Sequence, residues 1–223
     1  FKRIPNAYMS LEFLYLSSNS INQVNINMFR SLKNIKIIEL GNNLIEQIDT
    51  DAFSGLDNIK ELYFGRNNLT NFDSCSTIQS LADKTKFTLE KLVLTENELT
   101  QIKANTFGCF SNLKVLEVIG NSIEEIDLNS FKNLNKLEVL NLEDNDLKSL
   151  EKSELFNGLA NLKQLFLHEN LISIIGQSVF KTLGNLELLH LALNQIETVD
   201  ALLFDGLTNL KILHLDNNPI RAI

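Results

Sequence analysis

Large apolar residues recur along this chain in one fixed pattern. They occupy the first, fourth, sixth and eleventh places of an eleven-residue motif whose ninth place is asparagine. Nine copies of the motif begin at Leu11, Ile35, Ile59, Leu89, Leu113, Leu137, Leu162, Leu186 and Leu210. The copies begin 24 residues apart, except for a step of 30 after Ile59 and one of 25 after Leu137. Self-similarity at such a period indicates a solenoid of stacked repeats.

The apolar and variable places alternate within the centre of each motif. Because successive side chains of a strand face opposite sides, this alternation predicts one short, half-buried strand per repeat. The fourth and sixth residues should then face the core. The third, fifth, seventh, eighth and tenth should face outward. A single repeat cannot bury its apolar face, so neighbouring repeats must cover it.

Two other repeated residue types have predictable structural roles. The amide at the ninth place both donates and accepts, so stacked asparagines can bond turn backbone groups that would otherwise lack partners. A phenylalanine opens the segment F-x-x-L-x-x-L in most repeats and should stack into a spine on the convex side. These residues are Phe29, Phe53, Phe107, Phe131, Phe156, Phe180 and Phe204.

The motif L-x-x-L-x-L-x-x-N-x-L, with segments such as FKNLNKL and FDGLTNL, resembles the leucine-rich-repeat family over essentially the whole chain. The 24-residue repeat is similar to the typical extracellular subfamily, which includes Toll and Toll-like receptor ectodomains, Slit-type proteins and secreted insect immune proteins. The resemblance implies an α/β solenoid, a curved horseshoe with a concave parallel sheet and an irregular or short-helical convex side. Residues 1–223 should form this single solenoid.

The same resemblance implies a function in noncovalent protein binding. An extracellular recognition module, secreted or part of a receptor ectodomain, with a role in innate immunity is the leading expectation. The alternatives are an adhesion or matrix-organising protein and a cytosolic scaffold. Because the chain starts and stops within the repeat pattern, we expect it to be an excerpt of a longer protein. Flanking sequence or a partner should cover its ends, and other regions could mediate oligomerisation.

The net charge of -8 is concentrated on the predicted outward places. The acidic residues there are Glu39, Glu61, Glu96, Glu98, Glu117, Glu143, Asp144, Asp146, Glu169 and Asp216, against the basic residues Arg66 and Lys91. A concave surface of one sign focuses its field, so we expect a protein partner with a basic surface. The same charge argues against a nucleic-acid partner, because phosphate binding needs basic residues.

Apolar and aromatic residues also occupy the outward places and are typical anchors of interfaces. Together with the acidic residues and the histidines they define the predicted partner-binding face. Its residues are Phe13, Tyr15, Glu39, Tyr63, Glu96, Glu98, Glu117, Val139, Glu143, Asp144, Phe166, His168, His190 and His214.

The three histidines, His168, His190 and His214, lie at outward places of consecutive repeats. Two of them share the fifth place and should therefore be neighbours on adjacent strands. With an ordinary pKa near 6.5, they should move this end of the face toward positive charge on mild acidification. Such a row is too loose on an open sheet to predict a metal site. No cofactor is predicted either.

Catalytic motifs, an EF-hand loop and an apolar run long enough to span a bilayer are missing from the sequence, which predicts neither an enzyme nor membrane insertion. The opening FKRIPNAYMS shows no signal peptide. The two cysteines, Cys75 and Cys109, lie in the return segments of adjacent repeats. They are predicted to form a disulfide in an oxidising compartment, the alternative being two buried thiols. The sequence Asn68-Leu69-Thr70 predicts a glycan on Asn68 if the protein is secreted.

Overall fold

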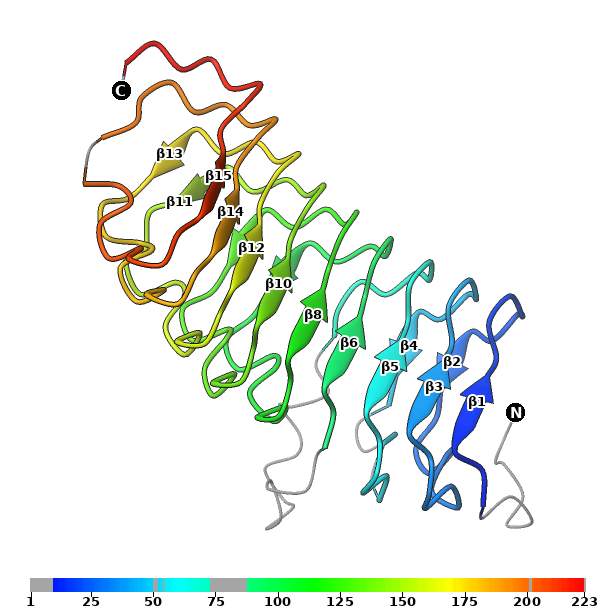
Figure 1. Ribbon diagram of the computed structural model, residues 1–223. Helices are drawn as coiled ribbons and strands as arrows, with labels where there is room; N and C mark the ends of the chain where they lie inside the picture. Colours follow the sequence, from blue (N-terminus) through cyan, green and yellow to red (C-terminus); the bar gives the residue numbers. More distant parts are fainter. Residues whose placement is uncertain (1–9, 50–51, 54, 73–87, 201, 223) are drawn as a thin grey trace.

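The chain forms an arc of stacked coils, each contributing one strand to a continuous sheet (Figure 1). This computed structural model describes residues 10–49, 52–53, 55–72, 88–200 and 202–222. Nine parallel strands follow one another in chain order along the concave side. These strands are β1 (Phe13–Tyr15), β3 (Ile37–Glu39), β5 (Glu61–Tyr63), β6 (Lys91–Val93), β8 (Val115–Glu117), β10 (Val139–Asn141), β12 (Gln164–Phe166), β14 (Leu188–His190) and β15 (Ile212–His214).

Each concave strand occupies the third to fifth places of its motif, and the strands pair in register. Leu140 of β10, for example, lies opposite Leu116 of β8 and Leu165 of β12, and all three are fully buried. The residues before and after this central leucine point to the other face of the sheet. Residues at the same motif place in consecutive repeats are therefore direct neighbours in space.

The convex side carries short strands and turns, and no helix occurs among the residues that the structure describes. Of the two forms expected for this side, the irregular one is present and the short-helical one is not. Its two-residue strands are β2 (Gln23–Val24), β4 (Gln47–Ile48), β7 (Gln101–Ile102), β9 (Glu125–Ile126), β11 (Ser149–Leu150) and β13 (Ile174–Ile175). Three parallel pairs form, β2 with β4, β7 with β9 and β11 with β13.

Strands β9 and β11 lie on neighbouring coils but do not pair. In the neighbouring junctions an amide closes the ladder, as Asp127 N–H does to Ile102 O at 2.9 Å. The repeat from Leu137 has one more residue between its convex strand and its spine phenylalanine than the repeat before it. At this junction the side chain of Lys152 reaches Ile126 O at 3.4 Å, beside a cavity of about 370 Å³.

The ninth-place asparagines link each coil to the preceding one. Asn43 accepts a hydrogen bond from Ile21 N–H at 3.0 Å and donates to Leu16 O at 2.9 Å, both in the preceding repeat. Its amide also donates to Leu40 O in its own coil at 3.0 Å. The same set recurs through Asn218. This ladder satisfies backbone groups inside the turns and confirms the role expected from the sequence.

The phenylalanine spine also forms as expected. Neighbouring rings from Phe107 to Phe204 stack with centroids 5.9–6.5 Å apart. Between Phe53 and Phe107, in the lengthened repeat, two other phenylalanines continue the contact. Phe64 lies 5.8 Å from Phe53, and Phe72 lies 6.3 Å from Phe64 and 6.1 Å from Phe107. The sequence did not suggest this route, because Phe64 occupies a leucine place.

The eighth place of every motif has a positive φ, which turns the chain sharply after the strand. The residues are Ser18, Asn42, Arg66, Glu96, Gly120, Asp144, Glu169, Leu193 and Asn217, with φ between 51° and 64°. Only Gly, Asn and Asp adopt this conformation readily, so at Leu193 the repeat geometry overrides the local preference. The turn directs the ninth-place asparagine back under the strand ends.

Replacing Asn170 by alanine should destabilise the solenoid. The variant loses the acceptor for Leu147 N–H and the donor to Leu142 O and Leu167 O. Since each buried backbone group left unbonded costs about 1–3 kcal/mol, we expect a loss of about 2–4 kcal/mol in urea unfolding. The control is Asn19→Ala, because the bonds of the Asn19 side chain to described residues go to carbonyls of its own turn. Equal losses in the two variants would contradict the role assigned to the ladder between coils.

Candidate binding face

The N-terminal end of the concave face is apolar. Phe13 and Tyr15 on β1 are 46% and 62% exposed, and Ile37 lies directly beside Phe13. Exposed aromatic side chains of this kind can bury a large area against a partner at a small cost in conformational entropy. This end of the face therefore offers apolar anchors, with the Glu39 carboxylate beside Tyr15.

Farther along the sheet, polar contacts hold the aromatic and charged side chains in place. Tyr63 on β5 donates its hydroxyl to Glu61 of the same strand. Lys91 on β6 lies 5.6 Å from the centre of the Tyr63 ring and forms an ion pair with Glu117 at 2.8 Å. Burial, with the neighbouring Glu61 carboxylate, raises the pKa of Tyr63, so its hydroxyl stays protonated. Glu117 is thus partly neutralised by Lys91.

Carboxylates gather where the chain leaves the strands. Glu96 accepts from Arg66 at 3.0 Å, and Glu98 accepts from Asn68 at 2.9 Å. A side chain added at Gly120 would meet Glu96 and Asp144 within 3.5 Å, so this glycine leaves a gap between the two acidic residues. The predicted residues Glu96, Glu98 and Asp144 therefore lie on one rim of the concave face.

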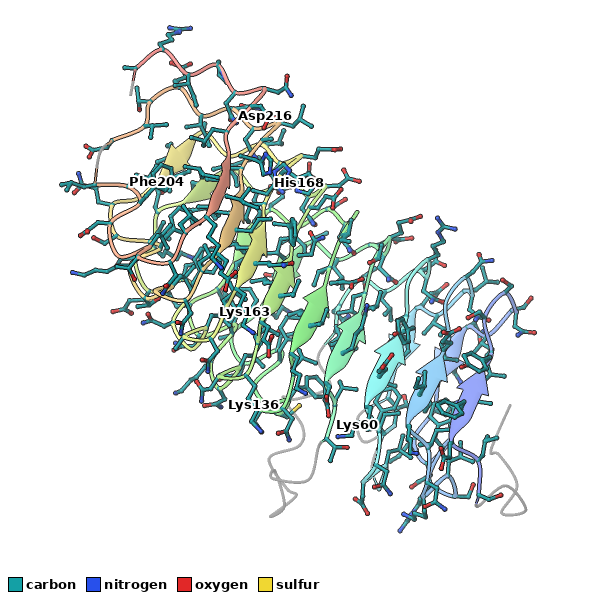
Figure 2. All side chains as sticks on the ribbon, viewed as in Figure 1. Lys60, Lys136, Lys163, His168, Phe204 and Asp216 are labelled. Carbon is teal, nitrogen blue, oxygen red and sulfur yellow. The ribbon has the colours of Figure 1, made fainter. Side chains whose placement is uncertain are left out.

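The three histidines form a continuous stack at the C-terminal end. His190 lies opposite His214 in the β14–β15 register, and their ring centres are 4.4 Å apart. His168, two residues beyond Phe166, turns back so that its ring lies 4.0 Å from that of His190. Phe166 contacts both rings at 6.1–6.3 Å. Figure 2 shows His168 and Asp216 at this end of the molecule.

Carboxylates contact the two ends of this stack but not its middle. His168 Nε2 lies 3.0 Å from Glu143 Oε1, and His214 Nδ1 lies 3.6 Å from Asp216 Oδ1. The Nδ1 atoms of His168 and His190 are buried without a hydrogen-bond partner. Burial, followed by the neighbouring His168 and His214, lowers the pKa of His190. His190 was expected to project into solvent, but its neighbours leave it half-buried because the three rings cover one another.

One group of side chains in the described part of the chain has metal-ligand atoms close together. Atoms of Glu143, His168 and Glu169 lie within 4.8 Å of one another. The imidazole Nε2 already lies at hydrogen-bond distance from Glu143, and the group is open to solvent on one side. The arrangement is that of a histidine–carboxylate pair with a second carboxylate nearby, and we assign no metal to it.

The structure thus groups the predicted face residues into three zones. Phe13, Tyr15, Glu39 and Tyr63 lie on the first three concave strands. The second zone is the acidic rim, formed by Glu96, Glu98 and Asp144, together with Glu117 on β8. The third contains Glu143, Phe166 and the histidine stack, with Val139 on β10 next to it. Lys91, Arg66 and the histidines, which the sequence also places on outward positions, contact several carboxylates of this face.

A ladder of lysines and glutamates borders the sheet at the second motif place. Lys36 contacts Glu12 at 2.7 Å, and Glu90 accepts from both Lys60 and Lys114 at 2.6 and 2.7 Å. The same pairing recurs between Lys163 and Glu138 and between Lys211 and Glu187, each at 2.8 Å. Figure 2 labels Lys60 and Lys163 along this edge. A comparison of second places between repeats would have predicted the ladder from the sequence.

The family of the chain follows from its repeats. The sequence profile described as "Leucine rich repeat" matches residues 9–82, 87–147 and 160–220. The chain belongs to the leucine-rich-repeat family. No curated protein sequence matches this leucine-rich-repeat chain significantly.

Two solved structures are similar to this leucine-rich-repeat solenoid. One is a TLR13–ssRNA13 complex, with 26% identity and a TM-score of 0.73 over 96% of this chain. The other is the Drosophila Toll–Spatzle complex, with 21% identity and a TM-score of 0.73 over 95% of this chain. The leucine-rich-repeat chain spans only 34% and 32% of those two chains. The resemblance to Toll and Toll-like receptor ectodomains is thereby confirmed.

The remaining predicted sites are only partly described. Cys75 lies outside the described residues, so the Cys75–Cys109 bridge stays a prediction, and Cys109 itself is nearly buried. Asn68 is half-buried, with its amide bonded to Glu98. Within the described ranges no helix has the length and apolarity needed to cross a membrane.

Replacing Glu90 by glutamine should lower stability in a pH-dependent way. Hydrogen bonds from Lys114 and Lys60 lower the pKa of Glu90 to about 2 from 4.5. Its contribution should be full above about pH 4.5 and decline as the pH falls through 2. Because the three side chains are a third or more exposed, we expect a loss of at most about 1 kcal/mol at pH 7.

Urea unfolding of the wild type and the Glu90→Gln variant between pH 7 and pH 2.5 measures this contribution. Glu12→Gln is the control, since Glu12 contacts a single lysine, and its effect at pH 7 should be smaller. A difference in stability between wild type and E90Q that stays constant over the whole pH range would contradict the ladder's electrostatic role.

Proposed function

We propose that this chain is a non-enzymatic recognition module that binds a protein with a basic surface across its concave face. The observation that carries the proposal is the in-register sheet, which places the outward residues of nine consecutive strands side by side. Such a face is continuous and open, so it suits an extended macromolecular partner. Catalytic sites usually exclude water, and an open face of this kind does not.

Charge supports the choice of a basic partner. Glu39, Asp144, Asp146 and Glu169 have no ion-pair partner among the described residues, although the lysines of the neighbouring edge are paired. These four carboxylates therefore contribute uncompensated negative charge to the concave face and its rim. Opposite charge on a partner would accelerate encounter and favour one orientation.

Aromatic side chains support direct contact at the N-terminal end. Phe13 and Tyr15 expose about half of their surface or more. Neighbouring Ile37 widens this apolar zone along the sheet. A partner that combines an apolar segment with basic residues would match both the first strands and the acidic rim.

We place the protein outside the cell, as a secreted protein or part of a receptor ectodomain with a role in innate immune recognition. The support is the likeness to Toll and TLR13 structures, which for Toll concerns the fold alone at 21% identity. TLR13 was solved with ssRNA13, so this comparison does not support the expected exclusion of nucleic acid. Preference for protein over nucleic acid rests on the acidic face, which repels phosphate.

Reversing two concave charges should weaken partner binding. The variant Glu39→Lys/Asp144→Lys changes the face, and Glu46→Lys/Glu154→Lys makes the same change in charge at exposed sites away from the sheet. Affinity capture from extracellular fluid with mass spectrometry, followed by titration of the captured protein, compares them. We expect affinity to fall about tenfold or more for the first variant, by analogy with disrupted charged interfaces, and little for the control.

A fluorescein-labelled nona-lysine peptide and a single-stranded RNA of similar length provide defined probes for the same variants. The peptide should bind the wild type and the control variant at pH 7.4, and the RNA should bind none of the proteins. Equal binding of the peptide to all three proteins would refute the concave site. RNA binding by the wild type would refute the choice of a protein partner.

Secretion should leave two covalent marks. In protein secreted from eukaryotic cells, we expect a glycan on Asn68 and a disulfide between Cys75 and Cys109. Peptide mass spectrometry with and without glycosidase, and with and without reduction, detects both. An Asn68→Gln variant is the control for the glycan. An unmodified Asn68 peptide together with two alkylatable thiols would contradict the extracellular assignment.

A further inference from the structure

The histidine stack follows directly from the parallel register of the last strands. Phe166 lies opposite His190, and His190 lies opposite His214. His168 then adds a third imidazole from the turn after β12. In the next repeat, the small residue Ala192 occupies the seventh motif place, which His168 occupies in its own repeat. Ala192 is 1% exposed. The three rings therefore form one column across three repeats.

The charged groups around the column are carboxylates. Glu143 contacts His168, Asp216 contacts His214, and Glu169 follows His168 in the chain within 4.8 Å of its ligand atom. No lysine or arginine forms an ion pair with these carboxylates among the described residues. With neutral imidazoles the column lies in a zone of three negative charges. Full protonation would bring the zone to neutrality rather than to positive charge.

Protons are not equally tolerated along the column. A proton on His168 or His214 faces a carboxylate at 3.0 or 3.6 Å. A proton on His190 faces two other imidazoles at 4.0 and 4.4 Å and has no directly bonded carboxylate. Like charges at such distances repel, and burial adds to the cost of a charge. A charge on the central ring is therefore disfavoured, in line with the lowered pKa of His190.

We propose that the three-histidine column is a proton-responsive part of the concave face, which reduces the attraction for a basic partner as the pH falls below about 6.5. The proposal rests on the proposed function, since it concerns the regulation of the same face. Each imidazole that gains a proton offsets one of the three negative charges of Glu143, Glu169 and Asp216. A basic partner held near this end at neutral pH is then released on mild acidification.

Titration of the chain without a partner tests the column itself. The imidazole resonances in NMR spectra from pH 8 to 4.5 should give His190 a midpoint below the ordinary 6.5. In a His168→Gln/His214→Gln variant the midpoint of His190 should rise, because its cationic neighbours are gone. Three equal midpoints, with that of His190 unchanged in the variant, would overturn the proposed coupling.

Binding of the labelled nona-lysine peptide at fixed ionic strength tests the consequence for partners. From pH 7.4 to 5.5 the affinity of the wild type for the peptide should fall about threefold or more. The change is modest because each carboxylate charge offset by an imidazolium contributes little at an exposed site. The His168→Gln/His190→Gln/His214→Gln variant should keep its affinity, because its carboxylates stay ionised over this range. If that variant fails to fold, three His→Phe substitutions preserve the stack without its titration.

The outcomes separate the two proposals. If the affinity of the wild type and of the triple variant falls by the same factor between the two pH values, the histidine column does not regulate binding, while the proposed function stands. If the peptide fails to bind the wild type at pH 7.4, the proposed function is refuted, and the gating with it. Loss of affinity in the wild type alone supports both proposals.

Discussion

The whole architecture depends on how each coil satisfies the backbone groups of the coil before it. Backbone hydrogen bonds between coils continue past the three-residue strands, as from Ser18 N–H to Gly41 O, but turn groups such as Ile45 N–H are bonded by an asparagine side chain. The asparagine of one coil accepts from an amide of the preceding coil and donates to carbonyls of both. Because buried unbonded backbone groups are costly, this side chain fixes the stacking distance. The leucine core and the phenylalanine spine then pack at that spacing.

The stacking distance also determines what the surface can do. Residues at one motif place form a row of neighbours about 5 Å apart. The contacts of a surface side chain are therefore determined mainly by the same motif place in the adjacent repeats. The second place forms a ladder of opposite charges that alternates from Lys60 to Lys211, and the fifth place contains two of the stacked imidazoles. A row of paired charges contributes to cohesion, while unpaired carboxylates and aromatics on neighbouring rows remain accessible to a partner.

The core, the asparagine ladder and most of the phenylalanine spine could be predicted from the sequence because they repeat with the period of the fold. Features that combine residues from two different motif places were harder to predict from the sequence. The stacking of His168 on His190 joins the seventh and fifth places, and the spine's route through Phe64 and Phe72 joins a strand to a return segment. The sequence could predict that the side chain of His190 faces outward, but it could not predict that this imidazole is half-buried. Half-burial arises when neighbouring rings cover each other, as His190 shows.

The unpaired strands β9 and β11 give the stack one junction unlike its neighbours. In a linear array each coil is stabilised only by the coils on either side, so stability is a sum over junctions. The missing ladder bonds make this junction weaker than those bridged by β7–β9 and β11–β13. Across this junction the coils are held by the pairing of β8 with β10, the asparagine ladder at Asn145 and the stacked rings of Phe131 and Phe156. Glu96 and Glu98 lie before this junction and the histidine column lies after it, so a partner that contacts both adds cohesion across the junction.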